Sequence, residues 1–136
     1  MQFIVQGYPA YAYTGGVEPD MKLPTVVFVH GAAFDHSVWQ WQSRYFAHHG
    51  FNALAIDLPG HGRSGGSPAA SVEEIAEWIG ALLDVIGARD ATLVGHSMGA
   101  LASEIPGAKF VALNAGHSMM SEAPKELLGA LRDFLR

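Results

Sequence analysis

The sequence predicts an α/β protein built on a mostly parallel sheet of about six strands. Three observations predict this class. Strand-length apolar runs at residues 25–30, 52–57 and 91–96 alternate with segments of helix length. These runs are apolar almost throughout, which is typical of strands that are buried on both faces of a parallel sheet. Two short β-type runs, divided by turn residues, come before them.

Those first runs predict an antiparallel hairpin. Residues 2–6 and 10–14 are of β type, and the break Gly7-Tyr8-Pro9 lies between them. A loop over residues 15–24 then leads to the first buried strand.

Three helices are expected to flank the sheet. The first is expected over residues 37–49, with Gly50 in the left-handed conformation behind it. The second is expected to begin with a capping box at Ser71 and to end at Gly87. The third is expected to begin near Pro124. The predicted core stripes are Val38, Trp41, Tyr45 and Phe46 in the first helix, Ile75, Ile79, Leu82, Leu83 and Ile86 in the second, and Leu127, Leu128, Leu131, Phe134 and Leu135 in the third.

Composition narrows the range of functions. With 136 residues, 49% of them hydrophobic, the chain is expected to form one domain over residues 1–136. A net charge of -5 argues against a nucleic-acid partner, and the absence of cysteine excludes disulfides and thiolate chemistry. We find no membrane-length apolar run and no leader, so we expect a soluble, cytoplasmic protein with no membrane partner.

The strongest chemical signal is Gly95-His96-Ser97-Met98-Gly99, directly after the strand 91–96 and before a helix-compatible run. This G-x-S-x-G pattern in a strand-turn-helix context is typical of a nucleophile elbow. The flanking glycines permit a sharp turn that exposes the serine. We therefore predict that Ser97 is a nucleophile.

Two further segments supply the partners that such a serine needs. His30-Gly31-Ala32-Ala33 ends a strand, and the backbone N–H groups of Ala32 and Met98 are the predicted oxyanion donors. In Asn114-Ala115-Gly116-His117, a histidine follows the predicted strand KFVAL. His117 is the only histidine after Ser97 and is the predicted general base.

A fourth segment, Asp57-Leu58-Pro59-Gly60-His61-Gly62-Arg63-Ser64, suits structure better than catalysis. We expect Asp57 and Arg63 to pair and to fix this loop. The remaining histidines are interpreted as structural or surface groups and not as metal ligands, so no metal or cofactor is expected.

In this order, the segments VVFVHG, DLPGHGRS, GHSMG and AGH resemble the α/β-hydrolase superfamily, and especially its bacterial esterase-like members. The resemblance covers nearly the whole chain. It implies a serine hydrolase with Ser97 as nucleophile, His117 as base, and Ala32 and Met98 at the oxyanion hole.

The chain also departs from that family. Only residues 98–108 separate Ser97 from Lys109, so the strand that carries the family's acid, and the helical cap, are missing. Glu104 is expected at the wrong end of the sheet. Asp35, Asp57 and Glu122 are the carboxylates that could replace the acid, although a Ser–His dyad is expected. The last strand is expected beside the strand 91–96.

These observations predict a hydrolase of small carboxylic esters that works through an acyl-enzyme. Two alternatives remain open: a non-catalytic or designed scaffold, and an acyltransferase or perhydrolase that uses the same serine. The shortened sheet is also expected to expose apolar surface and a strand edge, and from this we expect a homodimer. The identity of the ester stays open.

Overall fold

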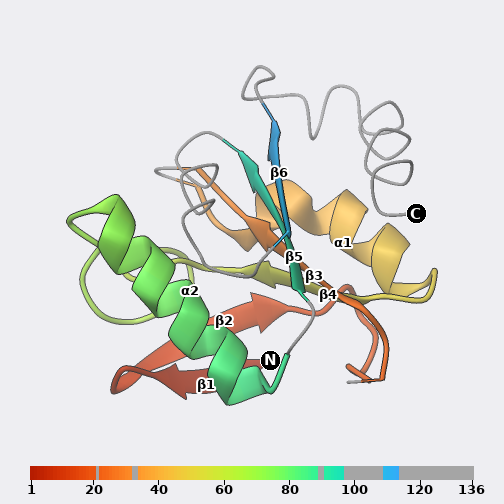
Figure 1. The fold of residues 1–136 in the computed structure, drawn as a ribbon, viewed down its shortest axis with the longest axis horizontal. Coiled ribbons are helices and arrows are strands. Elements are labelled where there is room, and N and C mark those ends of the chain that lie inside the picture. The colour runs from red at the N-terminus through yellow and green to blue at the C-terminus, as the bar shows by residue number, and fades with distance from the viewer. Residues whose placement is uncertain (21, 32–33, 89–90, 97–108, 114–136) are drawn as a thin grey trace.

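The computed structural model describes residues 1–20, 22–31, 34–88, 91–96 and 109–113. These residues form a six-stranded sheet in the order β1-β2-β4-β3-β5-β6 (Figure 1). Its strands are β1 (Gln2–Val5), β2 (Tyr8–Tyr13), β3 (Thr25–Val29), β4 (Asn52–Ile56), β5 (Ala91–His96) and β6 (Lys109–Leu113). The predicted class, a mostly parallel sheet of about six strands with an N-terminal hairpin, is confirmed.

Strands β3 to β6 form the parallel part of the sheet. β3 pairs with β4 on one side and with β5 on the other, and β6 pairs with β5 in parallel. In register, His96 at the end of β5 lies opposite Leu113 at the end of β6. The expectation that the last strand lies beside the strand 91–96 is therefore confirmed.

The hairpin β1–β2 extends the sheet on its other side. Gln6 and Gly7 connect the two strands, and both have positive φ angles of 50° and 84°. Two left-handed residues in a two-residue connection match the twist of an antiparallel pair. β2 then pairs with β4 in antiparallel fashion, opposite Ile56 and Ala55.

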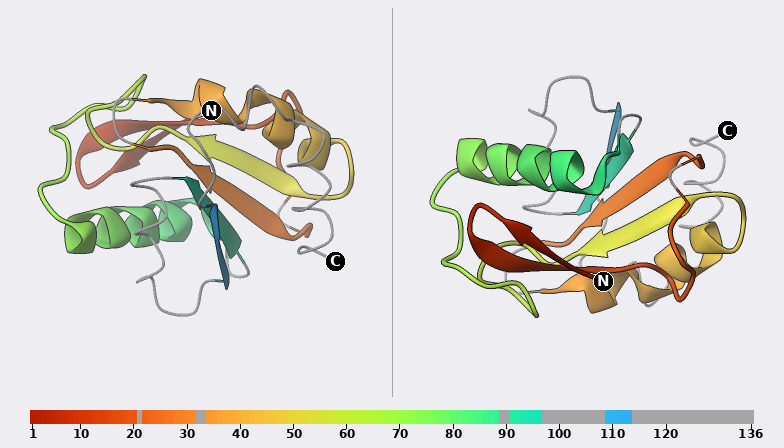
Figure 2. Two further views of the ribbon diagram at one scale, coloured as in Figure 1. Left: turned by 90° about the horizontal axis from the view of Figure 1, so that it is seen from above. Right: turned by 90° about the horizontal axis from the view of Figure 1, so that it is seen from below.

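Two layers of helix cover the sheet on opposite faces (Figure 2). Helix α2 (Val72–Ile86) packs over one face against β-strand side chains that include Val27, Leu54 and Leu93. The 3-10 helix η1 (His36–Trp39) and helix α1 (Gln40–Ala47) cover the other face. There they contact the alternate strand positions, including Phe28 and Ala55. Both faces of β3 and β4 are therefore buried, as their continuous apolar runs predicted.

The first helix differs from its predicted form. It begins with a 3-10 turn at His36, and the ring of Trp39 is fully buried, whereas the predicted core residue Trp41 is 51% exposed. Because a 3-10 turn has three residues per turn instead of 3.6, it changes the direction in which the following side chains point. The predicted stripe was wrong in phase at Trp41 and correct at Phe46.

Helix α2 agrees closely with its prediction. The Ser71 hydroxyl accepts a hydrogen bond from the Glu74 N–H at 3.2 Å, and Gly87 ends the helix with a φ of 81°. The Glu74 carboxylate accepts from the Ala70 N–H rather than from Ser71, so only half of the capping box forms. The core stripe also includes Trp78, which the sequence pattern missed.

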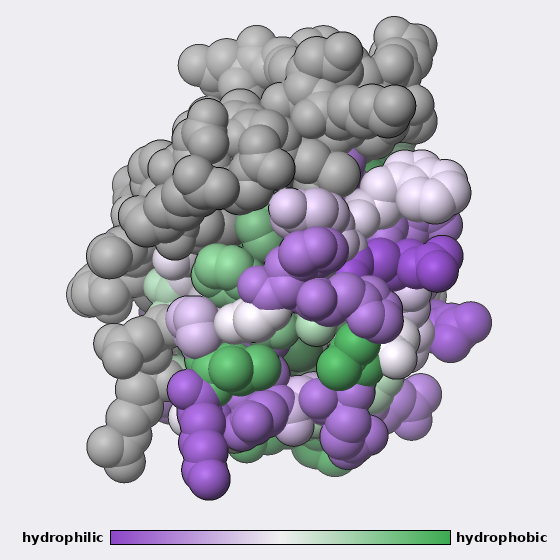
Figure 3. Space-filling view, turned by 90° about the vertical axis from the view of Figure 1, so that its right-hand side faces the viewer, coloured by the Kyte–Doolittle hydropathy of each residue, from purple (hydrophilic) through white to green (hydrophobic). Residues whose placement is uncertain are grey.

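The surface on the side of α1 is mostly hydrophilic, with small apolar patches between the polar side chains (Figure 3). No helix in the described part of the chain is both long enough and apolar enough to cross a membrane. The helix expected near Pro124 and the one expected after Ser97 lie outside the described residues.

Candidate active site

The parallel strands end at one edge of the sheet, and the candidate site is built on this edge. Val29 lies in register with Ile56 on one side and with Gly95 on the other. The chain therefore leaves β3, β4, β5 and β6 at the same edge. The residues that follow these strands carry the predicted chemistry, as is usual for ligand sites of open parallel sheets.

The two predicted catalytic residues follow neighbouring strands in the sequence. Ser97 directly follows the last residue of β5, and His117 comes four residues after the last residue of β6. Adjacent strands lie about 4.8 Å apart. Ser97, His117, Ala32, Met98 and Glu122 themselves lie outside the described residues, and their assigned roles stay predictions.

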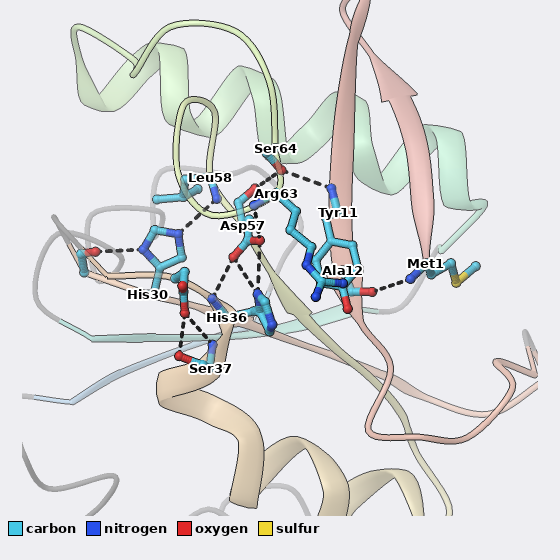
Figure 4. Close-up of polar contacts among 12 residues, drawn as sticks. Met1, Tyr11, Ala12, His30, His36, Ser37, Asp57, Leu58, Arg63 and Ser64 are labelled. Atoms are coloured by element: carbon cyan, nitrogen blue, oxygen red, sulfur yellow. Dashed lines mark hydrogen bonds and ion pairs between the residues drawn. The ribbon is translucent and has the colours of Figure 1, made fainter.

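Asp57 is the centre of the polar network at this edge (Figure 4). Its side chain is fully buried directly behind β4. Oδ1 accepts hydrogen bonds from the backbone N–H of His36 at 2.7 Å and from His36 Nδ1 at 2.9 Å. Oδ2 accepts from the backbone N–H of Arg63 at 2.8 Å. The carboxylate is thus the point at which the segments after β3 and β4 meet.

Gly62 makes room for this carboxylate. It has a φ of +51°, and a Cβ atom at this position would lie 2.3 Å from Asp57 Oδ2. A larger residue would therefore both strain the backbone and displace the carboxylate. The second glycine of the segment 57–64 is therefore required by the structure.

The expected pairing of Asp57 with Arg63 occurs through the backbone of Arg63. The Arg63 guanidinium lies 4.9 Å from the centre of the Tyr11 ring, an arrangement that favours a cation–π contact. The side chain that pairs with Asp57 is instead His36, whose Nδ1 lies 2.9 Å from Oδ1. The loop is fixed as expected, but by a different side chain.

Sequence reasoning missed this role of His36. Its ring lies 4.9 Å from the Tyr11 ring and 6.1 Å from the Tyr13 ring, measured between centroids. The two tyrosines and Asp57 enclose it on several sides. Because 21 residues separate His36 from Asp57, no local spacing could have indicated the pair.

His30 forms a second link between the two loops. Its Nδ1–H donates to the Gly31 carbonyl oxygen at 2.7 Å, and its Nε2 accepts from the Leu58 N–H at 3.0 Å. This requires a neutral imidazole with the proton on Nδ1. Burial lowers the pKa of His30, and the nearby His61 acts in the same direction. The neutral form that the hydrogen bonds need is therefore also the favoured one.

Asp35 has a local role at the start of η1. Its Oδ1 accepts from the Ser37 N–H at 2.8 Å and from the Ser37 hydroxyl at 2.5 Å. The hydrogen bond from that hydroxyl lowers the pKa of the Asp35 carboxyl. Asp35 and Asp57 were both predicted as substitute acids, and in the described residues both are engaged in structural hydrogen bonds. Whether either also supports His117 stays a prediction.

Asp35, His36 and Asp57 are also the one group in the described part of the chain whose spacing could hold a metal ion. The hydrogen bonds argue against that use. Asp57 already accepts three N–H groups, and Asp35 accepts two donors from Ser37. These donors suit a carboxylate that is held in place by the protein rather than by a cation.

A model of the "Alpha/beta hydrolase family" matches residues 26–108 of this chain. The match includes most of β3, the loop after β4 and the G-x-S-x-G segment that contains Ser97. It ends immediately before β6, so His117 lies beyond it.

Two curated relatives are similar over parts of their length. (E)-2-((N-methylformamido)methylene)succinate hydrolase from Acinetobacter baylyi is 31% identical over 77 residues, which are 56% of this chain and 29% of that protein. 2-Succinyl-6-hydroxy-2,4-cyclohexadiene-1-carboxylate synthase from Salmonella paratyphi B is 34% identical over 100 residues, 69% of this chain and 39% of that protein. The chain spans only 29% to 39% of the length of these relatives.

A solved structure shows the same fold at nearly the same length. The predicted CIB-like hydrolase from Thermoplasma acidophilum aligns with a TM-score of 0.78 over 99% of this chain and 96% of that one, at 19% identity. At this identity the likeness concerns the fold alone.

Proposed function

Because the chain belongs to the alpha/beta hydrolase family, we propose that it is a serine hydrolase that cleaves small carboxylic esters. Ser97 is the nucleophile and His117 the general base. The two curated relatives are named as a hydrolase and as a synthase. The family alone therefore leaves the reaction open, and the proposal depends on the site.

One observation carries the proposal: β5 and β6 are adjacent, parallel and in register up to His96 and Leu113. The segments that contain Ser97 and His117 leave neighbouring strands at the same edge. A serine and a histidine must come within hydrogen-bond distance for the imidazole to take the hydroxyl proton. Neighbouring strands bring the start of both segments to about 4.8 Å, which supports this pairing.

The proposed reaction has two steps. Ser97 Oγ attacks the ester carbonyl carbon while His117 accepts the hydroxyl proton, and His117 then returns this proton to the leaving alcohol. Water next attacks the acyl-serine, with His117 again accepting and returning a proton, and the carboxylic acid leaves. The backbone N–H groups of Ala32 and Met98 stabilise the oxyanion in each step.

The described network supports the oxyanion loop. His30, which precedes Ala32 in the sequence, accepts at Nε2 a hydrogen bond from the Leu58 N–H. His36, which follows Ala32, binds the Asp57 carboxylate. The residues on both sides of Ala32 are thereby tied to the end of β4. An oxyanion donor that is fixed before the substrate arrives requires no reorganisation during the reaction, and this makes it effective.

Activity of the full chain on p-nitrophenyl acetate tests the proposal. We expect Ser97→Ala and His117→Ala each to lower kcat/KM about 1,000-fold or more, because residues that act as a unit fail together. The exposed His48, changed to alanine, serves as the matched control and is expected to keep the activity of the parent.

Product analysis separates the alternatives. With water, methanol and hydrogen peroxide as competing acceptors, a hydrolase yields mainly the free acid. Preferential ester exchange or peracid formation would make the chain an acyltransferase or a perhydrolase. Equal activity of the parent and Ser97→Ala would contradict the proposal altogether.

A further inference from the structure

A pocket of about 300 Å³ lies away from the Asp57 network, between the β1–β2 turn, the loop over residues 59–69 and the first turns of α2. These three segments lie on the same side of the molecule, at the left of Figure 1. Ligand pockets span about 300 to 1,000 Å³, so this one suits only a small molecule.

The charge of the pocket is entirely negative in the described residues that line it. Glu74 and Glu77 are the charged side chains among them, and no lysine, arginine or histidine is present. The two glutamates lie three residues apart on α2 and so on one face of the helix, where like charges repel. Glu74 Oε2 accepts from the Ala70 N–H, whereas Glu77 has no hydrogen bond or ion pair in the described part of the chain. The described lining of the pocket therefore carries negative charge and no positive charge.

Aromatic side chains form two other parts of the wall. Trp78 follows Glu77 on α2 and is almost fully buried, while Tyr8, at the start of β2, is 58% exposed. Aromatic faces attract ammonium groups because their π electrons carry partial negative charge. Carboxylates beside aromatic rings thus give the pocket a preference for an organic cation over a neutral or anionic molecule.

The opposite wall is held in place before any ligand binds. The Gly60 N–H donates to the Gly65 carbonyl oxygen at 3.1 Å, and the Gly65 N–H donates to the Pro9 carbonyl oxygen at 2.8 Å. Gly66 packs beside Tyr8 and has a φ of +84°, a backbone conformation that favours glycine. Because this wall is already fixed, less conformational entropy is lost when a ligand binds.

We propose that this pocket binds a small organic ammonium ion, held by the Glu77 carboxylate and by the exposed ring of Tyr8. The proposal is independent of the esterase reaction, because it concerns residues that the reaction does not use. The expected ligand is a primary or quaternary alkylammonium compound of a few carbon atoms, which a pocket of about 300 Å³ can hold.

A titration of the full ¹⁵N-labelled chain tests the proposal, with choline as the probe and heteronuclear NMR as the readout. We expect saturable shifts at the amides of Gly65 and Gly66 and at the Trp78 indole N–H. The neutral analogue 3,3-dimethylbutan-1-ol has the same shape without the charge. It is expected to bind at least about fivefold more weakly, which corresponds to about 1 kcal/mol of cation–π and charge attraction.

Two variants with a matched control identify the binding groups. Glu77→Gln is expected to weaken choline binding about fivefold, and Tyr8→Leu about threefold. Glu73→Gln removes another exposed carboxylate from the same helix, outside the pocket lining, and is expected to leave the affinity unchanged. Unchanged shifts elsewhere in each spectrum show that the variants are folded.

Three results would overturn the proposal. The first is the absence of saturable shifts at tens of millimolar choline, and the second is equal binding of the neutral analogue. The third is an equal loss of affinity in Glu73→Gln and Glu77→Gln, which would reduce the effect to the net negative charge of the chain.

Discussion

Two carboxylates at the same edge of the sheet, Asp57 and Asp35, show how differently one residue type can act. Asp57 is fully buried and joins residues that are 21 and 6 positions away along the chain. The half-buried side chain of Asp35 binds, among the described residues, Ser37 two positions away. The first carboxylate stabilises the tertiary arrangement of two loops, and the second stabilises a single turn. Substitutions at the two sites should therefore differ in how far they lower the free energy of unfolding and in how many segments they affect.

Asp57→Asn is expected to have the largest effect. The amide cannot accept all three N–H groups that Asp57 accepts, so a buried donor is left without a partner and the pair with His36 is lost. We expect the free energy of unfolding to fall by about 3 kcal/mol. Urea denaturation measures this value.

The matched control for that substitution is Asp84→Asn on α2, where the side chain is exposed. It is expected to change the free energy of unfolding by less than about 0.5 kcal/mol. If the two variants were equally stable, Asp57 would not be the link between the loops.

His30 gives the same region a dependence on pH. Its pKa is lower in the folded protein than the value of about 6.5 in an unfolded chain. Between the two values the unfolded chain binds more protons, so stability rises with pH there. The contribution is complete above about pH 6.5 and is lost as the pH falls toward the lowered pKa, because protonated Nε2 cannot accept from the Leu58 N–H. The buried N–H without a partner costs about 2 kcal/mol.

Urea denaturation between pH 8 and pH 5, in steps, measures this dependence. His30→Asn is expected to flatten the decline relative to the parent chain. His48→Gln, at an exposed position, is expected to retain the parent slope. Parallel curves for the parent and His30→Asn would show that the pKa of His30 is the same in the folded and the unfolded chain.

The smallest effect is expected at Asp35. Asp35→Ala removes the acceptor of the Ser37 N–H at the start of η1, and loss of such a cap costs about 1 kcal/mol. Asp35→Asn keeps an acceptor and is expected to match the parent. Both values come from urea denaturation, and a loss at Asp35→Ala as large as that at Asp57→Asn would remove the contrast between the two carboxylates.

The sequence predicted the strands, the hairpin and helix α2 because these depend on local patterns. Continuous apolar runs, turn residues and the cap at Ser71 each act within a few residues. The phase of α1 was mistaken at Trp41 because the preceding 3-10 turn depends on Asp35 and Asp57 together. The pairing of His36 with Asp57 was missed because it exists only once β3 and β4 are side by side. Long-range polar contacts form only in the tertiary fold, and no local spacing in this chain encodes these contacts.

The placement of β6 beside β5 was predicted from the short connection over residues 98–108, and the structure confirms it. The same argument predicts that Ser97 and His117 come together. The motifs suggested Ser97 as nucleophile and His117 as base. The pairing of β5 with β6 supports the expectation that these two residues lie close together.

Reaction with a fluorophosphonate probe, followed by mass mapping of the labelled peptide, tests the central proposal most directly. The probe reacts with serines whose hydroxyl is activated by a neighbouring base. We expect a single label on Ser97 in the parent chain and in His48→Ala, and strongly reduced labelling in His117→Ala. A folded parent chain that remains unlabelled, or that carries the label on another serine, would contradict the assignment of Ser97 as the nucleophile.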